Sequence, residues 1–377
     1  MELDFVHATP GWIACRRGAA LDGTLAERCR AHGRRALLVC GTTLMRDGTI
    51  ERIAAHLRGA GLEVAVHGGI PPEPSLDDCR GAIAAAAGRD CVIAVGGGSV
   101  LDVAKAAALA PLDTDPSVWF DGAASVPETG ALPIVAIPTT AGTGSEATWV
   151  GVFTDRASGR KASFRGGAMM PSTVILDPLL TLTCSPRTSA WSGLDAFVQA
   201  VESATSVGAN PLTDALSMAA AARIAHALPK VLENGGDIDA REEMLLASCM
   251  AGIALNTSRL GLVHGLAHPI GAATGAAHGL LCGMLMPAVA RWNAAFVGDR
   301  YAELARAATG VANVESLARF VEDLLVRSGS PTRLRELDLP REALDRIARE
   351  SLGSGSSKAN PRTVDFAGAT EVLERAW

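Results

Sequence analysis

The sequence has few charged residues and no arrangement of cysteines that indicates disulfide pairing. Asp, Glu, Lys and Arg make up 20% of the 377 residues, and the net charge of −6 is spread without a basic stripe that could neutralise the phosphates of a duplex. The eight cysteines are scattered singly, without a CxxC pair, as in reduced cytosolic proteins. The first residues lack the basic start and the apolar stretch of a signal peptide. We therefore expect a cytoplasmic protein that does not bind nucleic acid.

Residues 261–290 contain no Asp, Glu, Lys or Arg and so resemble a membrane span in composition. Histidine, proline and several glycines interrupt this segment. Polar groups of this kind are costly in lipid but useful in a binding site. We expect the segment to belong to a site and the protein to have no membrane partner.

Hydrophobic residues make up 48% of the chain, enough for a large core, and the length favours two domains. In the first half, short apolar runs alternate with alanine-rich helical stretches; these runs are residues 35–40, 63–67, 91–95 and 133–137. This rhythm predicts a parallel sheet with helices on both faces. From about Thr183 onward, helical spacing dominates, as in residues 213–228 and 241–256. We predict an α/β domain over residues 1–184 and an all-helical domain over residues 185–377, with a ligand cleft between them.

Two loops rich in glycine and hydroxyl groups follow predicted strands. Gly96-Gly97-Gly98-Ser99 comes directly after the strand at 91–95 and opens a helix that contains Asp102. Glycines there let a phosphate approach the backbone, and the start of the helix supplies N–H groups; the alternative is a tight turn without a ligand. The second loop, PTTAGTGSE at 138–146, follows the strand at 133–137. Two such loops after neighbouring strands favour one extended ligand over two surface turns.

Three of the eight histidines, His264, His268 and His278, lie within fifteen residues. The first two are spaced i, i+4, which places both imidazoles on one face of a helix, and the segment GAATGAA can turn His278 back towards them. A lone buried histidine is usually a core residue, whereas three in an uncharged segment favour a polar pocket or a metal site. Asp195 lies among apolar neighbours on a predicted helix, with Gln199 one turn later. It would be a helix-start carboxylate or, with two histidines, the carboxylate of a divalent metal site.

Six segments, in this order, resemble the iron-containing (group III) alcohol dehydrogenase family, to which maleylacetate reductases, glycerol dehydrogenases and dehydroquinate synthases are related. They are GGGSVLDVAK at 96–105, IPTTAGTGSEAT at 137–148, ILDP at 175–178, GLDAFVQAVES at 193–203, VHGLAHPIGAATGAAHG at 263–279 and ANPR at 359–362. The resemblance covers nearly the whole chain. It implies the dehydroquinate synthase-like fold of that family, a Rossmann-like dinucleotide-binding α/β domain followed by an all-α domain. It also implies NAD(P)(H) and a divalent metal, Fe²⁺ or Zn²⁺, as cofactors.

The resemblance further implies which residues form the site. Gly96 to Ser99 would hold the pyrophosphate. The rest of the cofactor site would be lined by Gly41, Thr42, Asp102, Thr139, Thr140, Gly142, Thr143, Ser145, Lys161 and Leu179, the last two near the ribose. The metal would be held by Asp195, Gln199, His264 and His278. His268 would lie beside the substrate as a proton relay.

Two positions depart from the family pattern. Gln199 stands where the family has a histidine ligand, and because a neutral amide oxygen is a poorer donor than imidazole, we expect a bound but labile metal. Members that prefer NAD carry an aspartate just after the second strand, where this chain has Gly41. An acid there would repel a 2′-phosphate. Its absence favours acceptance of NADP(H), for which Arg46 is the nearest cation.

These features predict an oxidoreductase that transfers a hydride between NAD(P)(H) and a small alcohol, aldehyde or ketone, with a metal as Lewis acid and His268 as proton relay. A metal-free enzyme similar to maleylacetate reductases would instead use His264 or His268 as proton donor, although those enzymes have Asn where this chain has Asp195. A lyase similar to dehydroquinate synthase needs phosphate-binding cations, which residues 261–290 lack. A non-catalytic homologue would only bind nucleotide. We expect a small-molecule substrate and a homodimer or larger homo-oligomer.

Overall fold

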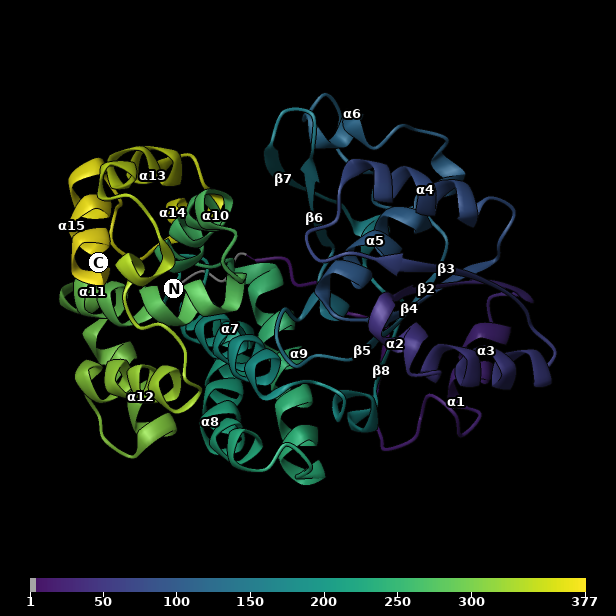
Figure 1. The fold of residues 1–377 in the computed structure, drawn as a ribbon, viewed down its shortest axis with the longest axis horizontal. Coiled ribbons are helices and arrows are strands. Elements are labelled where there is room, and N and C mark those ends of the chain that lie inside the picture. Colours follow the sequence, from purple (N-terminus) through teal and green to yellow (C-terminus); the bar gives the residue numbers. More distant parts are fainter. Residues whose placement is uncertain (1–4) are drawn as a thin grey trace. The chain divides into compact units, whose positions relative to one another are not determined.

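The computed structural model describes residues 5–377, which divide into two compact units (Figure 1). The α/β unit comprises residues 9–140 and 145–181. The helical unit comprises residues 5–8, 141–144 and 182–377. The division lies close to residue 184, with the exception of residues 141–144, which belong to the helical unit although they lie within the second glycine-rich loop.

Gly144 shows why this short piece packs with helices. Its φ of +62° is one that residues with a side chain rarely adopt, and a Cβ at this position would lie only 2.5 Å from the Cα of Gly252. The backbone at residue 144 therefore touches the backbone of α9 (Ile238–Ser258), and only glycine permits that approach.

The α/β unit contains a parallel sheet that, within the described residues, has six strands in the order β1-β8-β5-β4-β2-β3. The strands are β1 (Trp12–Cys15), β2 (Arg35–Gly41), β3 (Glu63–Ile70), β4 (Cys91–Gly96), β5 (Ile134–Pro138) and β8 (Thr173–Leu176). The four strands expected from apolar runs are β2, β3, β4 and β5, whereas β1 and β8 were not expected. A separate antiparallel pair, β6 (Val150–Asp155) and β7 (Arg160–Arg165), was also not expected.

Helices cover both faces of this sheet, which confirms the predicted α/β architecture (Figure 1). They are α1 (Thr24–Arg30), α2 (Thr42–Arg46), α3 (Thr49–Gly59), α4 (Leu76–Ala86), α5 (Gly98–Ala108) and α6 (Ser117–Phe120). Successive strand residues point to opposite faces. Leu38 and Ile93 pack in one core with α1 and α3, and Leu37 and Val92 pack in the other with α4 and α5. Burial on both sides explains why these strands are continuous apolar runs.

The helical unit has one large hydrophobic core, and its helices confirm the predicted all-α second half. They are α7 (Pro186–Thr205), α8 (Pro211–Glu233), α9 (Ile238–Ser258), α10 (Leu262–Thr274), α11 (His278–Thr309), α12 (Val314–Arg327), α13 (Leu344–Leu352), α14 (Gly355–Ala359) and α15 (Phe366–Ala376). Helix α7, which carries Asp195, begins at Pro186, and its N-cap Ser185 accepts a hydrogen bond from the Thr188 N–H. A proline at the first helical position and a serine cap are both typical helix starts.

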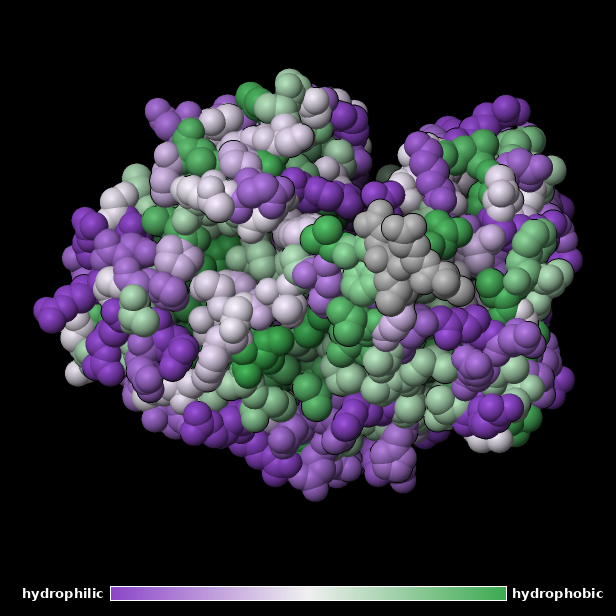
Figure 2. All heavy atoms as spheres, turned by 180° about the vertical axis from the view of Figure 1, so that it is seen from behind, coloured by the Kyte–Doolittle hydropathy of each residue, from purple (hydrophilic) through white to green (hydrophobic). Residues whose placement is uncertain are grey.

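Helix α11 is long and apolar enough to cross a membrane by length and composition alone. However, 72% of its apolar window is buried inside the protein, and a core helix meets the same criterion. On the face drawn in Figure 2, hydrophobic residues form groups with hydrophilic residues between and around them. Large apolar side chains that are well exposed, such as Val207 and Phe296, come from separate elements of the chain. Burial in the core of the helical unit therefore accounts for the hydrophobicity of α11.

A buried polar cluster supports the second loop in the α/β unit. The Lys105 ammonium on α5 donates to Ser145 Oγ at 2.7 Å, to Thr148 Oγ1 at 3.1 Å and to the Val150 carbonyl at 2.8 Å. Burial lowers the pKa of Lys105 to about 8, although the nearby charge of Asp102 acts against this shift. Burial also raises the pKa of the neighbouring Glu146 to about 7, with the charge of Lys105 acting against it. The net charge of this buried cluster therefore depends on pH.

We predict that ionisation of Glu146 destabilises the protein. Its pKa is about 7 in the folded chain against an ordinary value of 4.5. Between these pH values the unfolded chain releases a proton that the folded chain retains, so stability falls as pH rises through this window, by about 3 kcal/mol. Glu146→Gln should remove this loss. The measurement is the free energy of unfolding in urea at pH values on either side of the window.

The exposed Glu51, whose side chain is 75% exposed, supplies the matched control. Glu51→Gln should leave the pH dependence of the wild type unchanged. If the free energy of unfolding changes with pH in the same way for the wild type and for Glu146→Gln, Glu146 is not the group that causes the loss of stability.

Candidate metal centre and cofactor loops

Three helices of the helical unit bring four metal-binding side chains together. Asp195 comes from α7, His264 from α10, and His278 and Cys282 from α11. Helix α10 ends at Thr274, and a left-handed turn through Gly275 leads into α11. The turn places His278 beside His264, with ring centroids 5.2 Å apart. One donor atom from each of the four side chains lies within 4.8 Å of all the others.

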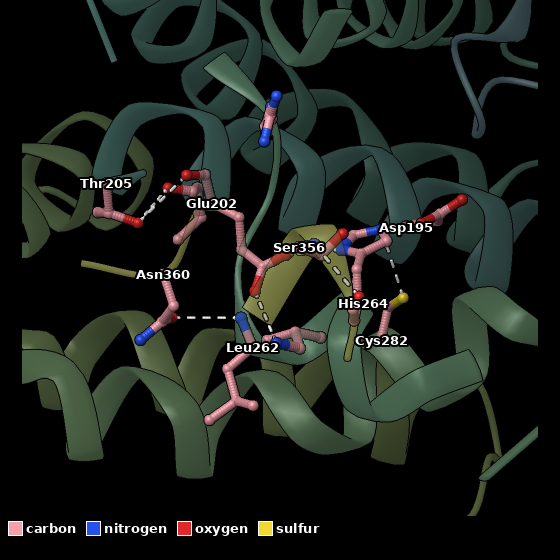
Figure 3. Close-up of polar contacts among 12 residues, drawn as sticks. Asp195, Glu202, Thr205, Leu262, His264, Cys282, Ser356 and Asn360 are labelled. Atoms are coloured by element: carbon pink, nitrogen blue, oxygen red, sulfur yellow. Dashed lines mark hydrogen bonds and ion pairs between the residues drawn. The ribbon is translucent and has the colours of Figure 1, made fainter. Parts of the chain in front are cut away.

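The distances within this cluster are those of a compact polar centre. His264 Nε2 lies 3.3 Å from Asp195 Oδ1, and His278 Nε2 lies 3.8 Å from the same oxygen. The Cys282 sulfur lies 3.7 Å from His264 Nε2 and 3.6 Å from His278 Nε2. Figure 3 shows Asp195, His264 and Cys282 pointing towards one another. All of these side chains are buried except that of His278, which is partly exposed.

Close approach of α7 and α11 depends on Gly279, which follows His278. A Cβ at this position would lie 2.0 Å from the Trp191 carbonyl oxygen and 3.2 Å from the Asp195 Cβ. Any larger residue would therefore push α11 away from α7. Gly279 therefore helps to bring the side chains of the cluster together.

Glu202, two turns after Asp195 on α7, holds His264 in place from the other side of the ring (Figure 3). His264 Nδ1 donates to Glu202 Oε2 at 2.6 Å, because a carboxylate can only accept, and the second oxygen accepts from the Val263 N–H at 2.7 Å. A neutral imidazole with its proton on Nδ1 would present the Nε2 lone pair to a bound metal. This outer carboxylate is typical of histidines that bind metals. Glu202 was not among the site residues expected from the sequence.

The electrostatics of the cluster favour a positive charge. Burial raises the pKa of Asp195, but the hydrogen bond from His264 and the charge of His278 outweigh burial, so the pKa of Asp195 lies below its usual range. Burial likewise lowers the pKa of His264, but the charge of Cys282 and the hydrogen bond with Asp195 outweigh it and raise the pKa well above its usual value. The centre therefore stabilises an added cation, which is the requirement for binding a metal.

Two further residues expected at the site lie beside this cluster. Gln199 is one turn after Asp195 and is buried, and its Oε1 has no hydrogen-bond partner among residues 5–377. A buried amide oxygen without a donor is costly, and a cation would satisfy it. His268 is partly buried, and its ring stacks on His278 with centroids 5.1 Å apart and an interplanar angle of 21°.

The residues present fit a divalent metal. A carboxylate with two imidazoles is a common donor set for such ions, and a thiolate adds a fourth donor. Cys282 was not among the residues expected from the sequence, although its spacing of i, i+4 from His278 places both side chains on one face of α11. That spacing was the available signal.

In the α/β unit, the glycine-rich residues lie at the carboxyl ends of adjacent strands. Gly41 ends β2, and Gly96 ends β4. These two strands pair in parallel. Strand β3 lies on one side of β2, and the next strand along the chain, β4, lies on its other side. Such a reversal of strand order is where open α/β sheets bind ligands. Thr139, after β5, donates its N–H to the Gly96 carbonyl at 3.0 Å. The loops after β4 and β5 are therefore direct neighbours.

The first loop opens α5 without a side-chain cap. Gly97 is the N-cap in an extended conformation, Gly98 begins the helix, and no side chain in the described part of the chain caps it. The N–H groups of its first turn therefore have no side-chain cap in this part of the chain, as a phosphate site would require. A Cβ at Gly97 would lie 3.2 Å from Thr140 Oγ1, so the two loops also touch through these residues.

The other residues expected to bind the cofactor have varied surroundings. Ser145 Oγ donates to Asp102 Oδ1 at 2.6 Å, and Asp102 also accepts from the Val152 N–H at 3.0 Å, so this pair ties the second loop to α5. Lys161 on β7 pairs with Glu73. The remaining positions are Thr42 and Arg46, which are exposed on α2, Leu179, which is 43% exposed, and Gly142 and Thr143, which belong to the helical unit.

Glu202→Gln should weaken metal binding by about 10- to 100-fold, the usual cost of losing an outer carboxylate. Glutamine keeps the shape of the glutamate side chain, but its amide donates hydrogen bonds as well as accepting them. His264 therefore loses the purely accepting partner that keeps its proton on Nδ1. Competition with a coloured chelator for zinc measures the affinity. The exposed Glu233→Gln on α8 should retain wild-type affinity, and an unchanged affinity for Glu202→Gln would refute the orienting role.

Comparison with known proteins places this arrangement in a family. The model of the iron-containing alcohol dehydrogenase family matches residues 10–178, and that of the Fe-containing alcohol dehydrogenase C-terminal region matches residues 189–377. A probable alcohol dehydrogenase, EutG, of Salmonella typhimurium is 36% identical over 98% of this chain and 94% of its own. The NADPH-dependent butanol dehydrogenase of Clostridium saccharobutylicum is 32% identical over 93% of this chain and 94% of its own. The structure of sulfoacetaldehyde reductase from Bifidobacterium kashiwanohense in complex with NAD⁺ has a TM-score of 0.91 and 29% identity, and covers 100% of this chain and 99% of its own. The chain therefore belongs to the iron-containing alcohol dehydrogenase family.

Proposed function

We propose that the protein is a metal-dependent NAD(P)(H) oxidoreductase that interconverts a small alcohol and its aldehyde or ketone. The observation that carries this proposal is the cluster of Asp195, His264 and His278 in a chain that matches a family of alcohol dehydrogenases over residues 10–178 and 189–377. Relatives act on small alcohols or aldehydes, as their names state. The same reaction class is therefore the simplest assignment for this chain.

The proposed roles follow from the chemistry of each residue. Asp195, His264 and His278 would hold the metal, and when bound it supplies a Lewis acid that polarises the substrate oxygen. Glu202 keeps the proton of His264 on Nδ1. His268, which is partly exposed and stacks on His278, would pass the hydroxyl proton to solvent. The glycine-rich start of α5 would bind and orient the nicotinamide cofactor, which would supply the hydride acceptor or donor.

For the cofactor, we propose that both NAD(H) and NADP(H) are accepted. The N–H groups at the start of α5 would bind the pyrophosphate, since helix N-termini bind anions. The chain has Gly41 at the end of β2, where an acid would exclude a 2′-phosphate. One of the relatives above uses NADPH and the other comparison holds NAD⁺, so the fold serves both.

The alternatives formulated from the sequence are not favoured. A metal-free reductase has no need of a buried carboxylate with two imidazoles and a thiol within 4.8 Å of one another. A non-catalytic homologue has no need of the outer carboxylate Glu202 that orients His264. The donor set and its support are both present in this chain, which favours a catalytic metal centre.

We further propose that the enzyme works in the cytoplasm as a homodimer or larger homo-oligomer, without a nucleic-acid or membrane partner. In the described chain none of the eight cysteines forms a disulfide, which suits a reducing compartment. Sedimentation of the purified protein, with and without nuclease and detergent, tests the oligomeric state and both excluded partners.

The function is tested with a panel of short alcohols and aldehydes, assayed with NAD(H) and with NADP(H). The wild type should turn over at least one pair with either cofactor. Asp195→Ala should lose both metal and turnover, because it removes the carboxylate ligand, whereas Asp299→Ala on the exposed part of α11 should retain both. Full turnover by Asp195→Ala would contradict the metal-dependent mechanism and favour the metal-free reductase. Tight cofactor binding by the wild type without any turnover would favour the non-catalytic homologue.

His268→Ala should lower turnover by about 10²–10⁴-fold, as expected for the loss of a proton-transfer group. Metal content should stay near the wild-type value, because His268 lies outside the group of four donors. Turnover and metal content are measured on the same preparation to distinguish a proton-transfer role of His268 from metal binding. The exposed His226→Ala is the control. Loss of the metal itself would identify His268 as a ligand.

A further inference from the structure

Cys282 occupies a position that a metal ligand would occupy. It is fully buried, it follows His278 by one turn of α11, and its sulfur lies 3.6 Å from His278 Nε2 and 3.7 Å from His264 Nε2. A buried cysteine is most often a small apolar residue. Here the sulfur faces two imidazoles, and the Asp195 carboxylate lies in the same group of donors. The environment is that of a donor atom.

Three of the six distances between these donors match a tetrahedral zinc site. With zinc bonds of about 2.0–2.1 Å to nitrogen or oxygen and about 2.3 Å to sulfur, neighbouring donors are about 3.3 Å apart, or about 3.6 Å apart for nitrogen and sulfur. The His264 Nε2 to Asp195 Oδ1 distance is 3.3 Å, and the two sulfur-to-nitrogen distances are 3.6 and 3.7 Å. The His278 Nε2 to Asp195 Oδ1 distance, 3.8 Å, is the only one of these four that is clearly longer. The remaining two pairs, His264 with His278 and Asp195 with Cys282, lie within 4.8 Å.

Gln199 is the alternative fourth donor. Its buried Oε1 lies one turn from Asp195 on the same helix and has no hydrogen-bond partner among the described residues. A neutral amide oxygen is a poorer donor to zinc than a cysteine sulfur.

We propose that Cys282 is the fourth protein ligand, in place of Gln199, and that it makes zinc the preferred metal of this member of an iron-named family. Two imidazoles and a carboxylate with open positions suit Fe(II), whereas tetrahedral donor sets that include sulfur suit zinc. Zinc also accepts a fifth donor during catalysis, so four protein ligands leave room for a substrate oxygen. This inference rests on the proposed function, because it assigns the metal of the same centre.

The test uses the full-length protein with its metal exchanged for cobalt(II). A sulfur ligand gives cobalt(II) an intense charge-transfer absorption in the near ultraviolet, which nitrogen and oxygen donors alone do not. The wild type should show this band. Cys282→Ala and Cys282→Ser should lose it, whereas Gln199→Ala and the buried Cys249→Ala, a matched control from α9 of the same unit, should retain it.

Metal preference gives a second readout that does not depend on activity. Apo-protein is offered equal zinc and ferrous iron without oxygen, and the bound metals are measured after gel filtration. The wild type should retain mainly zinc. Cys282→Ala should bind zinc at least about 100-fold more weakly, beyond the range for an outer-shell loss, and should shift the bound metal towards iron. Circular dichroism of each variant establishes that it is folded.

The outcomes separate this inference from the proposed function. If the wild type binds one cobalt(II) without the band, or if Cys282→Ala keeps the band, Cys282 is not a ligand, while the metal-dependent function stands. If Gln199→Ala loses the metal and Cys282→Ala does not, the amide is the fourth ligand and the proposal is overturned. If no metal binds and turnover continues, the proposed function itself fails. Should both Cys282 variants misfold, the presence or absence of the band in the wild type still decides the proposal.

Discussion

The burial of the Asp195 carboxylate is the constraint on which the centre of the helical unit depends. A carboxylate that is 3% exposed has lost its hydration and needs donors or positive charges close by. Those groups come from α10 and α11, and Gly279 lets α11 lie close enough to α7 for its side chains to reach Asp195. Glu202 on α7 in turn fixes His264. The same few contacts therefore pack three helices together and assemble the donors of the site.

Much of the fold was predictable from the sequence because burial leaves a clear pattern. Strands β2, β4 and β5 lie between two helical layers and are apolar except for Arg35 at the start of β2. Helices α8 and α9 are long enough for their spacing to be unambiguous. Strand β1 has only four residues, none of them fully buried, and β6 and β7 pair with each other outside the main sheet. Their pairing partners, and not their own composition, make them strands. The Lys105 cluster was likewise hidden, since its partners lie 40 to 45 residues away along the chain.

The candidate site was predictable where its residues are close in sequence and not where they act across the fold. The spacing of His264, His268 and His278 indicated a shared pocket, and the structure places all three rings together. Glu202 binds His264 from 62 residues away, which no local pattern could indicate. Cys282 carried a local signal, its one-turn spacing from His278, but a lone cysteine among apolar residues is indistinguishable from core packing until the sulfur is seen to face imidazoles. The family pattern directed attention to Gln199 and away from Cys282.

The central claim is that the cluster around Asp195 holds a metal that the reaction requires. The most direct measurement is a stepwise zinc titration of metal-free protein, with nicotinamide oxidation or reduction followed at every addition for a substrate that the native enzyme turns over. We expect negligible turnover before the first addition and a linear rise that levels off at one zinc per chain. Full turnover by the metal-free protein, unchanged by added zinc, would contradict it.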